Sequence, residues 1–163
     1  MEKLKLQSDI YSIYESDNNC AEEVAEFVVK ENYGHHLSQF LMDDVMDKEM
    51  SNVFAEERMH PNSIFYLART PQDKLIGSIR VFKWNRKDML PIEHVFCINP
   101  LERIGHSKNY SFWHVGRFAI KQKTGFSTLA LFKELMALAI CPIIHDKHGY
   151  MIAETDCKLL RTM

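Results

Sequence analysis

The clearest hydrophobic pattern along the chain is an apolar strand, a short polar turn and an apolar helix within residues 112–140. Residues 112–120 are mostly apolar, with one glycine, Gly116, in the middle. The helix, from residue 128 onward, is apolar nearly all round except for Lys133 and Glu134. A helix of that composition is expected to be buried against a sheet. The pattern therefore predicts a strand–turn–helix unit at the centre of the fold.

The N-terminal half shows strand and helix periodicities in turn. Residues 4–14 alternate well enough for a first strand, and residues 20–33 and 37–59 carry apolar side chains at helical spacing. Two further strands are predicted at 64–69 and 75–84, joined as a hairpin by a polar turn. Both have apolar residues at successive positions, which indicates a sheet covered on both faces.

Residues 85–110 are the least regular part of the chain. A short helix is predicted at 91–96 before Asn99-Pro100 interrupts it, and such a long irregular connection is often a substrate loop. Further on, residues 142–149 are predicted to be loop and residues 150–155 a strand, with a helix beginning at the next residue. The whole pattern predicts an α/β fold with a mixed, mostly antiparallel sheet and helices on both faces.

Composition narrows the class of protein. A chain of 163 residues is expected to form a single domain, residues 1–163, with a substantial core. With 20 basic and 22 acidic residues and no basic tract, nucleic acid is not a predicted partner. No signal peptide or long apolar run predicts a membrane span. The four cysteines lack metal or disulfide spacing, which predicts reduced thiols and a cytoplasmic location: Cys20, Cys97, Cys141 and Cys157.

The polar turn before the helix has the composition of an anion-binding loop. It contains Gln122, Gly125 and Ser127 in the spacing Q-x-x-G-x-S. Backbone N–H groups at a helix N-terminus have no intrahelical partner, and together with the helix dipole they hold phosphate. Lys121 and Lys123 flank the turn and could screen phosphate charge. The alternative is an ordinary strand–turn–helix connection.

The unit resembles the pyrophosphate loop of the Gcn5-related acyltransferases, Q/R-x-x-G-x-G/A, which binds coenzyme A. Residues 113–120, W-H-V-G-R-F-A-I, are similar to the W-E-L-S-R-F-A-V strand of the acyl-homoserine-lactone synthases, which share that superfamily with the bacterial N-acyl amino acid synthases. Gly77-Ser-Ile-Arg80 is similar to the G-x-x-R of their central hairpin. Ser127 stands in place of the last Gly/Ala. His114 stands in place of the synthase glutamate, which argues against homoserine-lactone chemistry.

The resemblance implies a fold, an activity and a set of ligand-binding residues. The activity would be transfer of an acyl group from acyl-coenzyme A, or from an acyl carrier protein, to an amine. No further cofactor is implied, because the thioester is a co-substrate. The superfamily continues with a helix and two strands, so a C-terminal helix and strands are expected to be missing here. The residues implied to bind the donor are Arg117, Phe118, Ile120, Gln122, Lys123, Thr124, Gly125, Phe126 and Ser127.

Gly116 and His114 are the residues implied to act at the reacting thioester. A glycine in mid-strand indicates a bulge or a close backbone approach, and a freed N–H there can polarise the thioester carbonyl. His114 lies two residues earlier and therefore faces the same side of the strand. Its position matches the general base of many acetyltransferases of the superfamily, and histidine can accept a proton at neutral pH. The alternatives are a packing glycine and a satisfied core histidine.

Four further side chains are candidates for binding the acceptor or for structural roles. Arg80 and Arg117 are charged residues in apolar strands, where an arginine needs a partner. The resemblance implies that Arg80, with Trp84 and Trp113, helps to position substrate. The tryptophans are more simply core residues. The alternative for the arginines is an ion pair with a glutamate: Glu93, Glu102 or Glu154.

Two other functions stay open at this point. A long-chain N-acyl amino acid or signal synthase would need an apolar tunnel, and Met42, Met46 and Met50 could form its flexible wall. The same methionines are more simply core. A non-catalytic acyl-coenzyme A binding or interaction domain is the second alternative. His145 and His148 lack further ligands nearby, so no metal site is predicted.

Overall fold

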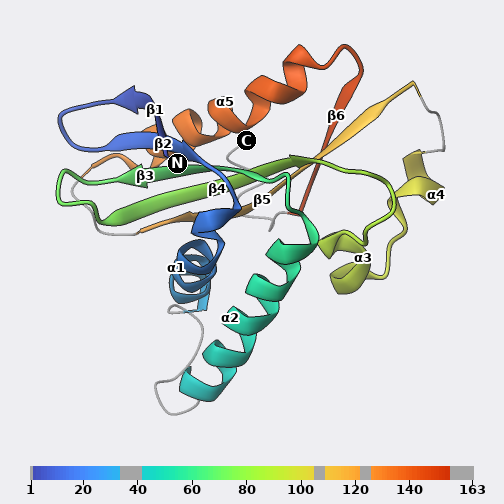
Figure 1. Cartoon of the computed structure of the whole chain (residues 1–163), viewed down its shortest axis with the longest axis horizontal. Helices are drawn as coiled ribbons and strands as arrows, with labels where there is room; N and C mark the ends of the chain where they lie inside the picture. The colour runs from blue at the N-terminus through green and yellow to red at the C-terminus, as the bar shows by residue number, and fades with distance from the viewer. Residues whose placement is uncertain (1, 34–41, 105–108, 122–125, 155–163) are drawn as a thin grey trace.

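A six-stranded sheet runs through the middle of the molecule (Figure 1). The computed structural model describes residues 2–33, 42–104, 109–121 and 126–154. The strands lie side by side in sequence order: β1 (Lys3–Gln7), β2 (Ser12–Ser16), β3 (Ile64–Arg69), β4 (Leu75–Lys83), β5 (Ser111–Ile120) and β6 (Gly149–Ala153). Neighbouring strands are antiparallel, except that β5 and β6 are parallel.

Helices cover both faces of the sheet (Figure 1). One face carries α5 (Thr128–His145). The other carries the 3₁₀ turn η1 (Asn18–Cys20), α1 (Ala21–Tyr33) and α2 (Met42–Met59). Two short helices, α3 (Pro91–Phe96) and α4 (Pro100–Ile104), lie toward one end of the sheet. The predicted fold class, a mixed and mostly antiparallel sheet between helices, is confirmed.

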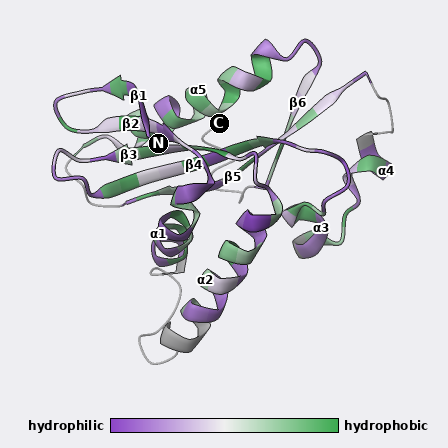
Figure 2. Cartoon of the chain, in the orientation of Figure 1, coloured by the Kyte–Doolittle hydropathy of each residue, from purple (hydrophilic) through white to green (hydrophobic). Residues whose placement is uncertain are grey.

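The main hydrophobic core lies between α5 and the sheet. Leu131 and Leu135 of α5 are fully buried there, and a Cβ added at Gly77 of β4 would lie 3.1 Å from Leu131 Cδ2. Gly77 therefore lets the helix approach the strand closely. Figure 2 shows how strongly hydrophobic residues predominate in α5. Among the described helices, α5 is the one whose length and composition would suffice to cross a membrane, but its inner face packs on the sheet.

The N-terminal segment differs from its prediction as one strand. The chain forms two strands, β1 and β2, that pair as an antiparallel hairpin. The turn between them is closed by Ser8, whose Oγ accepts from the Tyr11 amide at 3.1 Å and whose own amide donates to the Tyr11 carbonyl at 2.9 Å. The strand prediction was wrong because the apolar alternation continues across a turn that has no glycine or proline.

Two helix ends and one whole helix also differ from prediction. Helix α5 runs to His145 through Pro142, where a loop was predicted, because burial of Ile143 offsets the single backbone hydrogen bond that proline removes. Asp17 caps the N-terminal turn by accepting from the Asn19 amide at 3.0 Å. Helix α4 was not predicted at all. The first residues of the predicted second helix, 37–41, lie outside the described residues.

Candidate active site

Strand β6 ends beside the middle of β5. The pairs run from Ser111 with Gly149 to Val115 with Ala153, and among the described residues no strand continues along this edge of β5 beside Gly116–Ile120. On its other edge β5 stays paired with β4 as far as Ile120. We call the point where β6 ends beside β5, at Val115, Gly116, Ala153 and Glu154, the fork. A strand with one open edge can pair with an extended ligand arm.

A β-bulge follows directly after Gly116. Between the pairs Ser78 with Ala119 and Arg80 with Gly116, β5 has two residues where β4 has one. Arg117, the first of the two, has φ of 52°, in the left-handed region that few side-chain-bearing residues adopt. The Ser78 hydroxyl donates to the Arg117 carbonyl at 2.9 Å and stabilises this geometry. A bulge is one of the two features that a mid-strand glycine indicates.

The second feature, a close approach, is also present at Gly116. A Cβ added there would lie 2.8 Å from Cε1 of His114, so the imidazole packs directly over the glycine. His114 is 1% exposed and lies 5.0 Å, ring centre to ring centre, from Phe82. His114 and Gly116 therefore do face the same side of β5, as the period of a strand predicts.

Both ring nitrogens of His114 are engaged. Nε2 lies 2.8 Å from Oε2 of Glu154, which follows the last paired residue of β6. Nδ1 lies 3.3 Å from Nη2 of Arg80, whose side chain is completely buried. The histidine thus joins β4, β5 and β6 at the fork.

The two strand arginines are held by adjacent glutamates of α2. Arg80 donates to Oε1 of Glu57, and Arg117 Nε donates to the same oxygen at 2.6 Å. Arg117 Nη2 also lies 2.8 Å from Oε2 of Glu56. None of the three glutamates predicted to pair with these arginines does so. Glu154 bonds His114 instead, and Glu93 accepts from the Leu90 amide at 2.7 Å at the start of α3. Glu102 lies in the first turn of α4.

The sequence contains a signal for Glu57 that was missed. Glu57 lies four residues after Val53, which is buried against α1, and therefore falls on the inner face of α2. His60, three residues further on, is also buried and stacks on Phe82 with 4.2 Å between ring centres. A charged residue within an apolar helical stripe indicates a buried ion pair, as an arginine does in an apolar strand.

The charged side chains of this cluster shift one another's pKa values. Burial raises the pKa of the Glu57 carboxyl, but Arg80 and Arg117 more than offset that effect and hold the pKa below its usual value. Burial opposes the charged form of Arg117 too, yet Glu56 and Glu57 raise its pKa. Burial and then the Arg80 charge lower the pKa of His60. Glu57 is therefore a carboxylate fixed between two guanidinium groups.

The two tryptophans lie apart from this cluster. Trp84 is buried in a group of residues under α3, and its Nε1 donates to the Asp88 carbonyl at 2.7 Å. Trp113 precedes His114 and lies on the opposite face of β5, where its Nε1 donates to Oδ2 of Asp146 at 3.1 Å. Both have structural partners here.

The remaining predicted donor-binding residues start with Phe118, the second residue of the bulge. Phe118, Ile120 and Phe126 pack against the core under α5. Ser127 is the N-cap of α5, and its Oγ accepts from the Ala130 amide at 3.2 Å. The centre of the loop lies outside the described residues: Gln122, Lys123, Thr124 and Gly125.

Two of the candidate methionines pack between helices. Met46 and Met50 contact the buried cluster of Ala25, Val29 and Val53, which joins α1 to α2. The side chain of Met42 lies outside the described residues. The observed packing is the core role that the methionine stripe most simply predicts.

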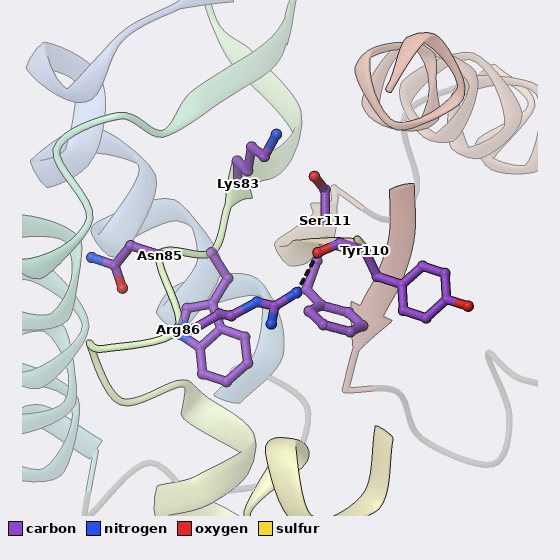
Figure 3. Close-up of a pocket in the computed structure, with 7 residues that line it drawn as sticks. Lys83, Asn85, Arg86, Tyr110 and Ser111 are labelled. Carbon is purple, nitrogen blue, oxygen red and sulfur yellow. Dashed lines mark hydrogen bonds between the residues drawn. The ribbon is translucent and has the colours of Figure 1, made fainter. Parts of the chain in front are cut away.

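A separate pocket of about 230 Å³ lies at the ends of β4 and β5 (Figure 3). Arg86 extends across it, donates to the Tyr110 carbonyl and lies 4.8 Å from the centre of the Phe112 ring. Lys83, at the rim, pairs with Asp146 at 2.8 Å. The lining includes no residue of the fork. Within the described part of the chain, no group of three or more His, Cys, Asp and Glu side chains is arranged for a metal ion.

The fold matches solved acyltransferase structures. A predicted acetyltransferase from Clostridium acetobutylicum, determined with acetyl-CoA, aligns over 94% of this chain and 86% of its own, with a TM-score of 0.58 and 7% identity. A GCN5-related N-acetyltransferase from Ralstonia eutropha aligns over 93% and 87%, with a TM-score of 0.58 and 6% identity. FeeM, an N-acyl amino acid synthase from uncultured soil microbes, aligns over 99% and 74%, with a TM-score of 0.59 and 11% identity.

Comparison of the sequence shows no such relatives, because no family model and no curated protein matches the chain. At these identities the structural matches establish the fold. The chain therefore has the fold of the Gcn5-related N-acetyltransferases, with strand β5 and helix α5 as its central strand–turn–helix unit.

Proposed function

We propose that this chain is an N-acyltransferase that moves an acyl group from a thioester to an amine. The observation that carries the proposal is the coincidence, at one point of β5, of the fork, the bulge after Gly116 and a buried histidine–carboxylate contact. An open strand edge, a displaced backbone and a proton-accepting group are what aminolysis of an extended thioester needs.

The donor would lie along the open edge of Gly116–Ile120. Its pantetheine arm would pair with the strand, and a backbone N–H at the bulge would stabilise the oxyanion. The loop of residues 122–127 would hold the pyrophosphate at the N-terminus of α5. Arg117 would act indirectly, because its guanidinium is held by α2 and fixes the bulge from which it projects.

The donor carrier and the acyl length are finer parts of the proposal. Coenzyme A and the phosphopantetheine of an acyl carrier protein would use the same edge of β5. A long-chain N-acyl amino acid or signal synthase is the alternative, supported by the similarity around residues 113–120. A reducing, cytoplasmic location agrees with the free thiols of Cys20, Cys97 and Cys141.

The test is acyl transfer itself. The protein would be incubated with acyl-coenzyme A donors and a mixture of primary amines and amino acids, and new amides would be identified by mass spectrometry. We expect amide and free thiol to form in equal amounts. A protein that binds the donors but forms no amide with any acceptor would favour the non-catalytic alternative. A protein that neither binds nor transfers would contradict the proposal.

A further inference from the structure

Glu154 occupies the fork directly. It follows Ala153, the last residue of β6 paired with β5, and it lies two residues after Ile152, the partner of His114. It therefore projects from the same face of the sheet as the histidine. Its side chain is 21% exposed, and its Oε1 has no hydrogen-bond partner among the described residues. Oε1 itself is buried, so one carboxylate oxygen holds the imidazole while the other is a buried acceptor without a partner among the described residues.

The hydrogen bonds of His114 decide which of its nitrogens carries a proton. A guanidinium has donors only, so Arg80 Nη2 at 3.3 Å requires Nδ1 to be the acceptor. Nε2 must then carry the hydrogen and donate to Glu154 at 2.8 Å. A doubly protonated ring would direct an N–H at the Arg80 donors. In this arrangement neither nitrogen offers a free lone pair to a substrate.

Arg80 is held in place, so its hydrogen bond to the Nδ1 lone pair of His114 is not easily broken. Its side chain is fully buried, and its other terminal nitrogen donates to Glu57. Burial raises the pKa of Glu154, whereas the hydrogen bond from His114 and backbone hydrogen bonds at Glu154 and Ile92 lower it, and the net shift is downward. The geometry and the charge therefore agree: at neutral pH the ionised group at the fork is the carboxylate.

We propose that Glu154 is the catalytic proton acceptor and that His114 is a positioning residue that holds it. This assignment rests on the proposed N-acyltransferase function. The amine nitrogen forms a bond to the thioester carbonyl carbon, and the carbonyl π pair moves to oxygen. The ammonium proton of this intermediate passes to Oε1 of Glu154. Collapse re-forms the carbonyl and breaks the C–S bond, and the leaving thiolate takes up the proton.

The test compares two isosteric variants, Glu154→Gln and His114→Gln. Glutamine at 154 can still accept from His114 but cannot take up a proton, whereas glutamine at 114 can still donate to Glu154. For Glu154→Gln we expect kcat to fall by roughly 10²–10⁴-fold with the donor Kd within about twofold of wild type. For His114→Gln we expect a fall of at most about tenfold, because the carboxylate is retained.

Two further readouts separate a catalytic from a structural role. In the wild type, kcat at saturating amine should show no limb near the ordinary histidine pKa of about 6.5. Added formate should restore activity to Glu154→Ala, whereas imidazole should not restore it to His114→Ala. A limb near pH 6.5 that His114→Gln removes, or rescue of His114→Ala by imidazole, would make the histidine the base and overturn the assignment.

The outcomes also separate this assignment from the function it rests on. A wild-type protein that transfers acyl groups while Glu154→Gln keeps its full rate overturns the assignment alone. A wild-type protein that forms no amide and binds no donor removes the function, and the assignment with it.

Discussion

At the scale of single residues, the geometry of the fork depends on a glycine, Gly116, which has no side chain. His114 packs where the Cβ of residue 116 would be, at 2.8 Å, and Gly116 therefore sets the position of the imidazole relative to Arg80 and Glu154. The sequence predicts that His114 and Gly116 share a face, because that follows from the period of a strand. It does not show which glutamate holds which side chain, because Glu57 and Glu154 are distant from β5 in sequence.

Adding a methyl group at Gly116 should therefore displace His114. For Gly116→Ala we expect a loss of about 1–3 kcal/mol of unfolding free energy and a marked loss of turnover per folded molecule. Gly77→Ala is the matched control, since its Cβ would meet the ends of two leucine side chains at 3.1 and 3.2 Å and the Ala68 Cβ at 3.4 Å, and not His114. It should lower stability and leave turnover unchanged. Equal turnover in both variants would contradict this role of Gly116.

Ionisation of Glu57 should make the free energy of unfolding depend on pH in the acid range. Its pKa is lowered in the folded state, so its contribution is present above the unfolded pKa of about 4.3 and is lost as pH falls through the folded pKa. Glu57→Gln should cost about 3–5 kcal/mol near neutral pH, because it leaves Arg80 and Arg117 short of a charge partner.

Urea unfolding measured between pH 7 and 3 tests this dependence. The stability of Glu57→Gln should fall less steeply with acid than that of the wild type. Glu26→Gln is the control, because Glu26 forms an exposed pair with Lys30 and should cost less than about 1 kcal/mol. Parallel pH curves for wild type and Glu57→Gln would show that Glu57 does not titrate with a shifted pKa.

At the scale of elements, the predictable parts were those that a local pattern determines. Strand β3 and strand β4 lie within one residue of their predicted bounds, because each apolar run is bounded by polar turn residues. The β1–β2 hairpin was missed since its turn is closed by a serine hydroxyl and not by glycine or proline. The end of α5 was missed because proline was treated as a stop, although Ile143 beyond it is buried.

Pro142 should weaken the last turns of α5. It removes one backbone donor inside the helix, so Pro142→Ala should raise the free energy of unfolding by about 1–2 kcal/mol, less than the full interior penalty because the unfolded chain also gains freedom. Pro91→Ala is the control, since Pro91 occupies the first turn of α3 where proline is tolerated. Thermal unfolding of both variants measures the difference. A lower melting temperature for Pro142→Ala would mean that the proline shapes the helix to fit the sheet.

At the scale of the whole molecule, the sheet brings together groups that the sequence keeps apart. Glu57 of α2, Arg80 of β4, His114 of β5 and Glu154, directly after β6, meet on one face of the sheet beside the fork. The need for partners was predictable from buried arginines, but the choice of partner was not, since it depends on how α2 crosses the strands. Strand β5 and helix α5 follow each other closely in sequence, and both were predicted from local patterns.

The long-chain alternative predicts that the acyl donor is longer than acetyl. Each methylene that enters an apolar tunnel contributes about 0.8 kcal/mol, so about eight methylenes would contribute roughly 6 kcal/mol before ordering costs. Rates measured from acetyl to dodecanoyl donors should therefore rise with chain length. A maximum at acetyl would contradict the long-chain alternative and leave an N-acetyltransferase, a result with which the core packing of Met46 and Met50 would agree.

The central claim is that a thioester donor binds along β5 with its pyrophosphate at the N-terminus of α5, and calorimetry with coenzyme A tests it most directly. The wild type should bind, and Gly125→Glu should abolish binding while far-UV circular dichroism stays unchanged, because a carboxylate would occupy the anion site. Asn52→Glu, the same change of charge at an exposed position of α2, should bind like the wild type. Equal affinity in wild type and Gly125→Glu, or no binding by the wild type, would contradict the account.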